Sequence, residues 1–373
     1  MDIPFAETLL AWYVRRKAAG GVQPIEGLNP QTVERVLYVA TTGLGDAILS
    51  MPVVDSVQNA WPHAKSALFI RSAWRALFED DPRFQTLIDY QGKWRDFFGA
   101  LNRLKAFRPD LVIILHGNDP DILPLCHLSG TPFMIRVPWS GTRYPYLLSN
   151  AHRPEDQYPG KRLHYIDNRL GVLKPLGIAP STRAPTLHVS GTNRRAMADR
   201  IRRRLPGMRG YWLFHPHASG HYKDWPRPKA RTFLETMLET ETELGVVLTG
   251  SGKNRSGAAA LAAGLPPDRV WNSAGELRLA ETAAALAGGR LLVTPDTGVM
   301  HLAAALDVPT VTLLAPTKAW GIGPRSRQAL HKVIEKPLTC DPCRNKHCPY
   351  QPARCMDQIG VDEVLAAARN RLT

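Results

Sequence analysis

Two series of short apolar segments, separated by stretches long enough for a helix, are the feature of this sequence that most restricts its fold. The first series comprises residues 35–40, 66–70 and 110–115, and the second comprises residues 210–215, 245–249, 290–293 and 309–314. Apolar runs of this length are typical of strands buried on both faces, and helix-length connections are typical of parallel sheets. The sequence therefore predicts an α/β protein with two Rossmann-like, doubly wound parallel-sheet domains.

The length of the chain agrees with two domains, because 373 residues exceed what one compact core usually holds. A polar stretch rich in Pro, Ser, Thr and Gly at 178–192 is predicted to link them. We accordingly expect an N-terminal extension at 1–30, a first domain at 31–185 and a second at 186–373.

The N-terminal extension carries apolar residues at roughly helical spacing, among them Leu9, Trp12 and Tyr13, followed by Arg15, Arg16 and Lys17. This pattern predicts a helix. Most such apolar stripes are packing surfaces, so we expect the helix to dock on its own domain. A peripheral contact with the inner membrane is the alternative.

The charge of the chain favours acidic partners. Lys and Arg number 47 and Asp and Glu number 33, which gives a net charge of +14. Six arginines crowd the segment 194–204, but no aromatic residues alternate with them, so we predict a solvated helix face and no nucleic-acid partner. No signal-peptide pattern or run of about 18 apolar residues is present, which predicts a cytoplasmic protein.

The first motif that carries chemistry follows the apolar segment 35–40 and reads Thr42-Gly43-Leu44-Gly45-Asp46. Ligands of α/β sheets bind at such strand ends, and the two glycines let a substrate approach the backbone. The motif is not a dinucleotide fingerprint, because Ile48 stands where the third glycine would be. Asp46 is either a helix cap or a general base.

The second motif follows the apolar segment 210–215 and contains Ser219 and Lys223 before a Trp-Pro pair. Lys223 is a candidate for neutralising a diphosphate, with a solvated surface lysine as the alternative. Gly250 lies in the next such loop, where Gly250-Ser251-Gly252-Lys253 has some likeness to a phosphate loop. That loop lacks the Gly and the Ser or Thr required at 247 and 254.

The third motif, Asp296-Thr297-Gly298-Val299-Met300-His301, follows the apolar segment 290–293. A polar turn that opens a helix here offers backbone amides to phosphate oxygens. Asp296 could equally cap that helix, and His301 could be a core histidine.

Together, Thr42-Gly43-Leu44-Gly45-Asp46, Lys223-Asp224-Trp225-Pro226 and Asp296-Thr297-Gly298-Val299-Met300-His301 resemble the heptosyltransferase family, the inverting glycosyltransferases of family 9. The resemblance implies a GT-B fold with an interdomain cleft and no catalytic cofactor or metal. It implies that Asp46 is the base, that Lys223 contacts the diphosphate, and that Asp296, Thr297, Gly298 and His301 belong to the nucleotide-sugar site. The candidate substrate contacts are Thr42, Gly43, Gly45, Ser219, Lys223, Gly250, Asp296, Thr297, Gly298 and His301.

The reaction that this resemblance implies is transfer of heptose from ADP-heptose to an anionic glycolipid, the inner core of lipopolysaccharide. A branch of the family that modifies autotransporter proteins leaves a protein acceptor open. A GT-B-fold sugar-nucleotide epimerase is the rival of another reaction class. Asp119-Pro120-Asp121 imitates a metal-binding Asp-x-Asp, but we predict a pair at a helix start.

Four cysteines at 340–355, namely Cys340, Cys343, Cys348 and Cys355, have the short spacing of a metal site. They predict one structural metal away from the chemistry, with loosely clustered thiols or disulfides as the alternative. Spacing does not choose between zinc and iron. The resemblance adds that such a group holds iron in the autotransporter branch.

Overall fold

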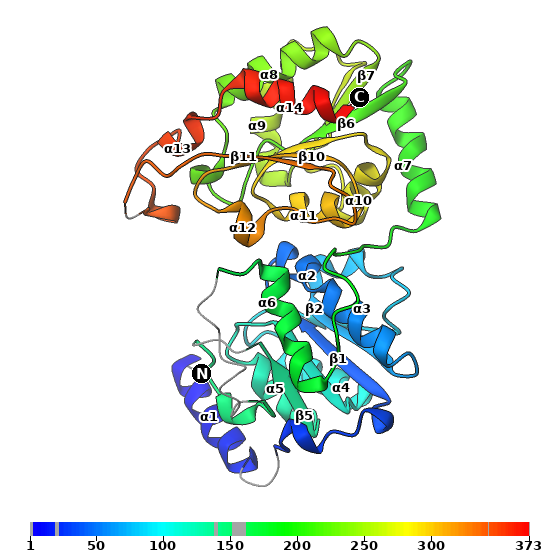
Figure 1. Cartoon of the computed structure of the whole chain (residues 1–373), viewed down its shortest axis with the longest axis vertical. Coiled ribbons are helices and arrows are strands. Elements are labelled where there is room, and N and C mark those ends of the chain that lie inside the picture. The colour runs from blue at the N-terminus through cyan, green and yellow to red at the C-terminus, as the bar shows by residue number, and fades with distance from the viewer. Residues whose placement is uncertain (1–2, 19–21, 138–140, 151–161, 342, 373) are drawn as a thin grey trace. The chain divides into compact units, whose positions relative to one another are not determined.

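The computed structural model describes residues 3–18, 22–137, 141–150, 162–341 and 343–372. The chain divides into two compact units, Met1–Arg183 (unit 1) and Ala184–Thr373 (unit 2). Each unit contains one sheet with helices packed against it (Figure 1). All strand pairs in the described residues are parallel.

Unit 1 contains a five-stranded sheet in the order β3-β2-β1-β4-β5. The chain runs outward from β1 through β2 to β3 and then returns to the other side of β1 with β4, so its direction of progress reverses between β1 and β4. The strands are β1 (Arg35–Ala40), β2 (Lys65–Arg71), β3 (Thr86–Tyr90), β4 (Leu111–His116) and β5 (Phe133–Arg136). The helices are α1 (Ile3–Ala18), α2 (Leu44–Leu49), α3 (Met51–Ala60), α4 (Phe97–Phe107), α5 (Ile122–Leu128) and α6 (Tyr165–Leu170).

The core of unit 1 follows from the alternation of side chains along its strands. Leu37 and Val39 of β1 point to one face, where they pack in a cluster with Leu104 of α4 and Leu125 of α5. Val14 of α1 is buried in the same cluster. The N-terminal helix is therefore docked on its own unit, as we expected from its apolar stripe.

Unit 2 contains a six-stranded sheet in the order β11-β10-β9-β6-β7-β8, in which the reversal falls between β6 and β9. The strands are β6 (Gly210–Phe214), β7 (Leu244–Leu248), β8 (Val270–Asn272), β9 (Leu292–Pro295), β10 (Thr310–Leu314) and β11 (His331–Glu335). The helices are α7 (Gly191–Arg204), α8 (Arg227–Thr240), α9 (Arg255–Ala262), α10 (Leu279–Gly288), α11 (Gly298–Ala305), α12 (Ala319–Ile322), α13 (Arg354–Asp357) and α14 (Val361–Leu372). Its core is built around the rings of Trp212, Phe214 and Phe233.

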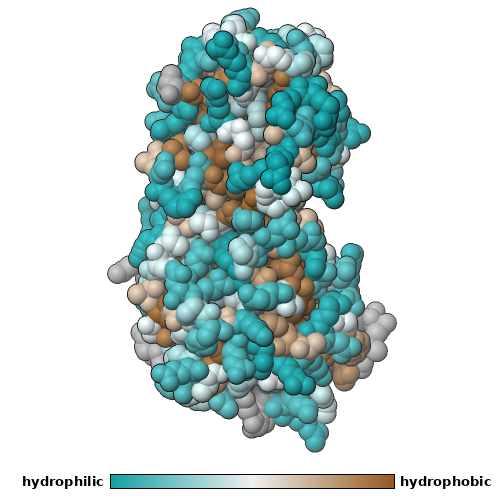
Figure 2. All heavy atoms as spheres, turned by 90° about the vertical axis from the view of Figure 1, so that its right-hand side faces the viewer, coloured by the Kyte–Doolittle hydropathy of each residue, from teal (hydrophilic) through white to brown (hydrophobic). Residues whose placement is uncertain are grey.

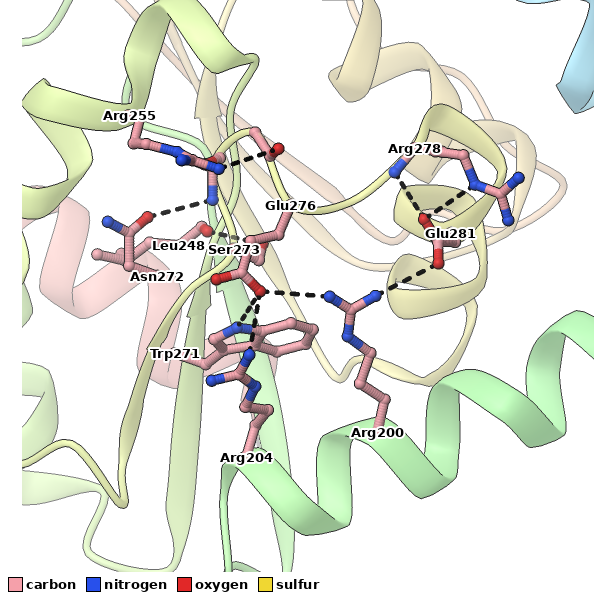
Figure 3. Close-up of polar contacts among 12 residues, drawn as sticks. Arg200, Arg204, Leu248, Arg255, Trp271, Asn272, Ser273, Glu276, Arg278 and Glu281 are labelled. Atoms are coloured by element: carbon pink, nitrogen blue, oxygen red, sulfur yellow. Dashed lines mark hydrogen bonds and ion pairs between the residues drawn. The ribbon is translucent and has the colours of Figure 1, made fainter.

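The arginine-rich helix α7 has an exposed face and also makes contacts within unit 2. Arg200 and Arg204 lie over the ring of Trp271, at 5.1 and 5.6 Å from its centroid (Figure 3). Both guanidinium groups also pair with Glu276 at 3.3 Å. α7 lies on the side that Figure 2 turns to the viewer, where most of the visible side chains are hydrophilic. These two arginines thus bind within unit 2. Arg194, Arg195, Arg202 and Arg203 of the same helix are exposed, as the prediction of a solvated face expects.

The apolar segments of the sequence belong to these cores. In the described part of the chain, no helix combines the length and the apolar character that crossing a bilayer requires.

Candidate functional site

Asp46 lies at the carboxyl edge of the sheet in unit 1, beside the point where the strand order reverses. The loop after β1 carries it into the first turn of α2, and the neighbouring strand β4 ends at His116. Open α/β sheets bind their ligands at such reversal points, where adjacent connections leave in opposite directions. The topology thus places the glycine motif where a small ligand fits.

The carboxylate of Asp46 does not cap helix α2 but contacts other side chains. The N-cap of α2 is Gly43, and Asp46 is the third residue of the helix. Its Oδ1 accepts a hydrogen bond of 2.6 Å from Nη2 of Arg169, which is almost fully buried in α6. Its Oδ2 accepts a longer bond of 3.3 Å from the Thr42 hydroxyl. Thr42, Asp46, His116 and Arg169 together form what we call the Asp46 cluster.

His116 completes this cluster from β4. Its Nδ1 lies 2.5 Å from Oγ1 of Thr42, and its Nε2 lies 3.7 Å from Oδ1 of Asp46, too far for a hydrogen bond. Burial lowers the pKa of His116, the Asp46 carboxylate opposes that shift, and the Arg169 guanidinium adds to it. The imidazole is therefore neutral near pH 7.

Two side chains, from the end of β2 and the segment after it, bind the backbone of the glycine loop. Trp74 donates from its indole nitrogen to the carbonyl of Thr42 at 2.8 Å, and Arg71 donates to the carbonyl of Thr41 at 3.1 Å. At Gly43 itself, an added Cβ would lie 3.1 Å from Oδ2 of Asp46. Gly45 follows as the second residue of α2. The glycine at 43 thus leaves room beside the carboxylate.

The Asp-Pro-Asp segment has a structural role. Asp121 precedes α5 as its N-cap residue and accepts hydrogen bonds from the Tyr90 hydroxyl at 2.8 Å and the Trp94 amide at 2.9 Å. Asp119 accepts from the same hydroxyl at 2.9 Å and pairs with Arg71 at 3.4 Å. The structure therefore confirms the prediction of a pair at a helix start.

Lys223 and Asp296, two candidates predicted from different motifs, meet in unit 2. Nζ of Lys223 lies 2.5 Å from Oδ2 of Asp296, and the Thr317 hydroxyl donates to the same oxygen at 2.9 Å. The lysine follows β6 and the aspartate follows β9, so this pair also lies where the strand order of its sheet reverses. The carboxylate is 6% exposed and the lysine 15%. Neither side chain is a solvated surface group or a helix cap.

The turn after Asp296 opens α11 as the sequence predicted. Thr297 is the N-cap residue, with no side-chain hydrogen bond to the helix, and Gly298 is the first helical residue. The amides of this first turn are thus not occupied by a capping side chain. His301 lies one turn further along and is buried inside the unit.

The two remaining predicted contacts lie on loops of the same sheet edge. Ser219 is exposed in the loop after β6. Gly250 follows β7, and its carbonyl accepts a 2.9 Å hydrogen bond from the amide of Gly275. Gly275 has φ +73°, and a Cβ there would meet Cα of Gly252 at 2.8 Å, so the two loops pack too closely for side chains at this point.

In the described part of the chain, the four C-terminal cysteines are not placed as a metal-binding group. Within the described ranges, no three His, Cys, Asp or Glu side chains are placed so that they could hold a metal ion. Cys355 of α13 is buried in the core, whereas Cys340 and Cys343 are half-exposed. The structure thus gives no support to the predicted metal site.

Comparisons with known proteins agree with this arrangement. Residues 135–354 match the model of glycosyltransferase family 9 (heptosyltransferase). The chain is 30% identical to lipopolysaccharide heptosyltransferase 1 of Pseudomonas aeruginosa over 335 residues, which cover 85% of this chain and 88% of that protein. It is 30% identical to lipopolysaccharide heptosyltransferase 2 of Salmonella typhimurium over 312 residues, covering 79% and 86%.

Among solved structures, the chain resembles ADP-heptose lipopolysaccharide heptosyltransferase II of E. coli. The TM-score is 0.74 at 21% identity, and the alignment covers 91% of this chain and 98% of that one. This likeness establishes the fold, two parallel-sheet halves of the GT-B type.

Proposed function

Because the chain belongs to glycosyltransferase family 9, the heptosyltransferase family, we propose that it transfers heptose from ADP-heptose to an inner-core acceptor of lipopolysaccharide, with inversion at the anomeric carbon. The related proteins of P. aeruginosa and S. typhimurium are named lipopolysaccharide heptosyltransferases, which supports the transfer of heptose to this acceptor. The similar E. coli structure is named an ADP-heptose heptosyltransferase, which supports this donor.

The observation that carries the proposal is the placement of two reactive groups at two reversal points. The carboxylate of Asp46 lies at the reversal point of the sheet in unit 1. The ion pair of Lys223 with Asp296 lies at the reversal point of the sheet in unit 2. Glycosyl transfer from a nucleotide sugar needs a base for the acceptor hydroxyl and positive charge for the departing diphosphate. The chain offers both.

On the acceptor side, Asp46 takes the proton of the attacking hydroxyl. Arg169 holds its Oδ1 at 2.6 Å, whereas Oδ2 has only the 3.3 Å bond from Thr42. Oδ2 is therefore the oxygen that would accept the proton. Arg169 acts here as a positioning residue, because it fixes the direction of the carboxylate without touching the acceptor.

On the donor side, the positive charge of Lys223 and the amides at the start of α11 stabilise the ADP that leaves. The lysine approaches from the loop after β6, and Thr297 and Gly298 bring the amides from the turn after β9. A helix N-terminus attracts anions because its amides have no partners within the helix. Asp296 holds Lys223 in place before the donor binds.

The two alternative reactions are not favoured. A protein acceptor and a sugar-nucleotide epimerase remain the competitors to exclude by experiment, since the named relatives act in neither way. An epimerase would consume its nucleotide sugar without any acceptor.

A transfer assay tests the proposal. Incubation with ADP-heptose and a heptose-free inner-core glycolipid should add the mass of one heptose to the lipid. Asp46→Asn should lower turnover by roughly 10²-fold or more while ADP affinity changes little. The matched control is Asp110→Asn, which removes another half-buried, arginine-paired carboxylate from the opposite edge of the sheet. Equal loss in both variants, or transfer only to protein, would contradict the proposal.

Two finer parts of the proposal concern location and metal. A glycolipid acceptor fits a cytoplasmic enzyme that works at the inner membrane. One structural zinc or iron on Cys340, Cys343, Cys348 and Cys355 stays a hypothesis, supported by their spacing and by the packing of Cys348 against the core cluster that contains Cys355. No step of the reaction depends on this metal.

A further inference from the structure

The N-terminal helix α1 has apolar side chains on two sides. One side is satisfied, because Val14 is fully buried in the core of unit 1 and Leu10 packs against that core. On the other side, Leu9 is 53% exposed, Trp12 59% and Tyr13 44%. Docking on unit 1 therefore explains only part of the apolar stripe of this helix.

The exposed side of α1 continues onto α4. Phe98, at the start of α4, is 76% exposed. This exposed fraction is larger than that of the other large apolar residues in the described chain. Between the two helices lies a hollow of about 950 Å³, which we call the α1–α4 hollow. Its lining includes Leu9, Trp12, Phe98 and Leu101. Contiguous exposed apolar surface of this kind marks a binding surface and not scattered chance exposure.

The charged side chains that line the hollow are basic. Of the described residues that line it, none is acidic, and Lys17 and Lys105 are among them. Arg16 lies over the ring of Trp12 at 5.7 Å from its centroid. The nearby carboxylate of Glu7 is already occupied, because it pairs with Lys93 at 2.8 Å and with Arg143 at 2.9 Å.

We propose that the α1–α4 hollow and its basic rim dock unit 1 on an anionic lipid bilayer. Aromatic side chains such as Trp12 and Tyr13 favour the boundary between headgroups and acyl chains. Lys17 and Lys105 can keep their apolar stems in the hollow while their ammonium groups reach the phosphates. We choose a bilayer over an apolar partner protein because the lining combines exposed aromatic rings with the cations of Lys17 and Lys105.

This inference rests on contacts within unit 1 and goes beyond the proposed transfer reaction, because vesicle binding requires neither donor nor acceptor. If the proposed function holds, docking would keep unit 1 at the surface that carries its glycolipid acceptor. The two ideas can therefore fail separately.

Flotation of the full chain with lipid vesicles tests the inference. The protein should bind vesicles of phosphatidylethanolamine and phosphatidylglycerol, bind phosphatidylcholine vesicles at least about tenfold less, and release at high salt. The double substitution Trp12→Ser with Phe98→Ser should weaken binding at least about tenfold, since both rings leave water on docking. Both side chains are exposed, so the fold should tolerate the change.

Two further variants keep the test decisive. Lys17→Glu with Lys105→Glu should weaken binding to the anionic vesicles at least about tenfold without removing any apolar group. Leu338→Ser, which changes an exposed apolar residue of unit 2, should have no effect. Transfer to a soluble acceptor without acyl chains should be unchanged in all of them.

Three results would overturn the inference: no binding of the wild-type chain to anionic vesicles, equal binding by the Trp12/Phe98 variant, or a self-associating wild type that this variant makes monomeric. The last result would identify the hollow as a contact between copies of the chain. Vesicle binding by a chain that transfers no heptose would support docking while contradicting the proposed function.

Discussion

Substitution of Lys223 by alanine tests the proposed donor site. Because Lys223 is paired with Asp296, the substitution should affect ADP binding in two ways. The substitution removes the cation and leaves Asp296 6% exposed, with Thr317 as its remaining side-chain donor. The site would then present an uncompensated carboxylate to the diphosphate. A Lys223→Ala variant should therefore bind ADP worse than the loss of one contact explains.

The magnitude follows from two contributions. Loss of a charge-assisted hydrogen bond costs about 1.5–3 kcal/mol. Repulsion between Asp296 and a phosphate about 5 Å away adds about 3 kcal/mol at an effective dielectric constant of about 20, before salt and rearrangement reduce it. We expect Lys223→Ala to weaken ADP binding by about 3 kcal/mol or more. Lys223→Ala with Asp296→Asn should lose only the contribution of the contact, about 1.5–3 kcal/mol, because the repulsion is gone.

Isothermal calorimetry with ADP measures both variants, and circular dichroism confirms that they fold. Lys336→Ala is the matched control, since Lys336 also pairs with a carboxylate, Glu363 at 2.8 Å, but on the β11–α14 side of unit 2. Its ADP affinity should be normal. Unchanged affinity in Lys223→Ala would remove the lysine from the diphosphate site. A double variant weaker than the single one would refute the repulsion argument.

Three further predictions concern other parts of the chain. Gly43→Ala should lower turnover about tenfold without affecting ADP affinity, because its Cβ would crowd Oδ2 of Asp46; normal turnover would show that the carboxylate has room to move. Burial lowers the pKa of His215 to about 4, so the unfolded chain, with a pKa of about 6.5, binds the proton more readily and stability is lost as pH falls through that range. Between about pH 7.5 and pH 5, urea unfolding should show about 2 kcal/mol less pH dependence in His215→Gln than in the wild type. An unchanged pH dependence would show that His215 is not its source. Elemental analysis should find about one zinc or iron per chain that Cys343→Ser loses, whereas metal-free wild type of undiminished thermal stability would end the metal hypothesis.

The central strands of both sheets could be predicted from the sequence, and the outer strands could not. The strands that the apolar runs predicted are largely buried, and they are β1, β2, β4, β6, β7, β9 and β10. β5 and β8 have only four and three residues, too few for a periodic signal. At the edge of unit 2, β11 is mostly exposed and contains His331 and Lys332, so its sequence is that of a loop.

Those residues of the candidate site that lie in small-residue loops after predicted strands could be proposed from the sequence. Asp46 and Lys223 lie in the segments that follow β1 and β6, and local sequence pointed to both. Arg169 gave no such signal, because it lies in an ordinary helix 123 residues from Asp46 and reaches it only through tertiary folding. His116 had a signal that was overlooked: it is the polar residue that ends a predicted central strand.

The wholly parallel pairing of the strands has a consequence for how the chain folds as it is synthesised. A parallel pair cannot close through a hairpin, so every strand must wait for a crossover before it gains a neighbour. β1 reaches its second partner only when Leu111 can lie beside Val36, and β6 meets β9 only when Leu292 can lie beside Leu213. The most apolar strands therefore leave the ribosome long before their edges are covered, and each half depends during that interval on chaperones or on rapid helix docking to keep those edges from aggregating.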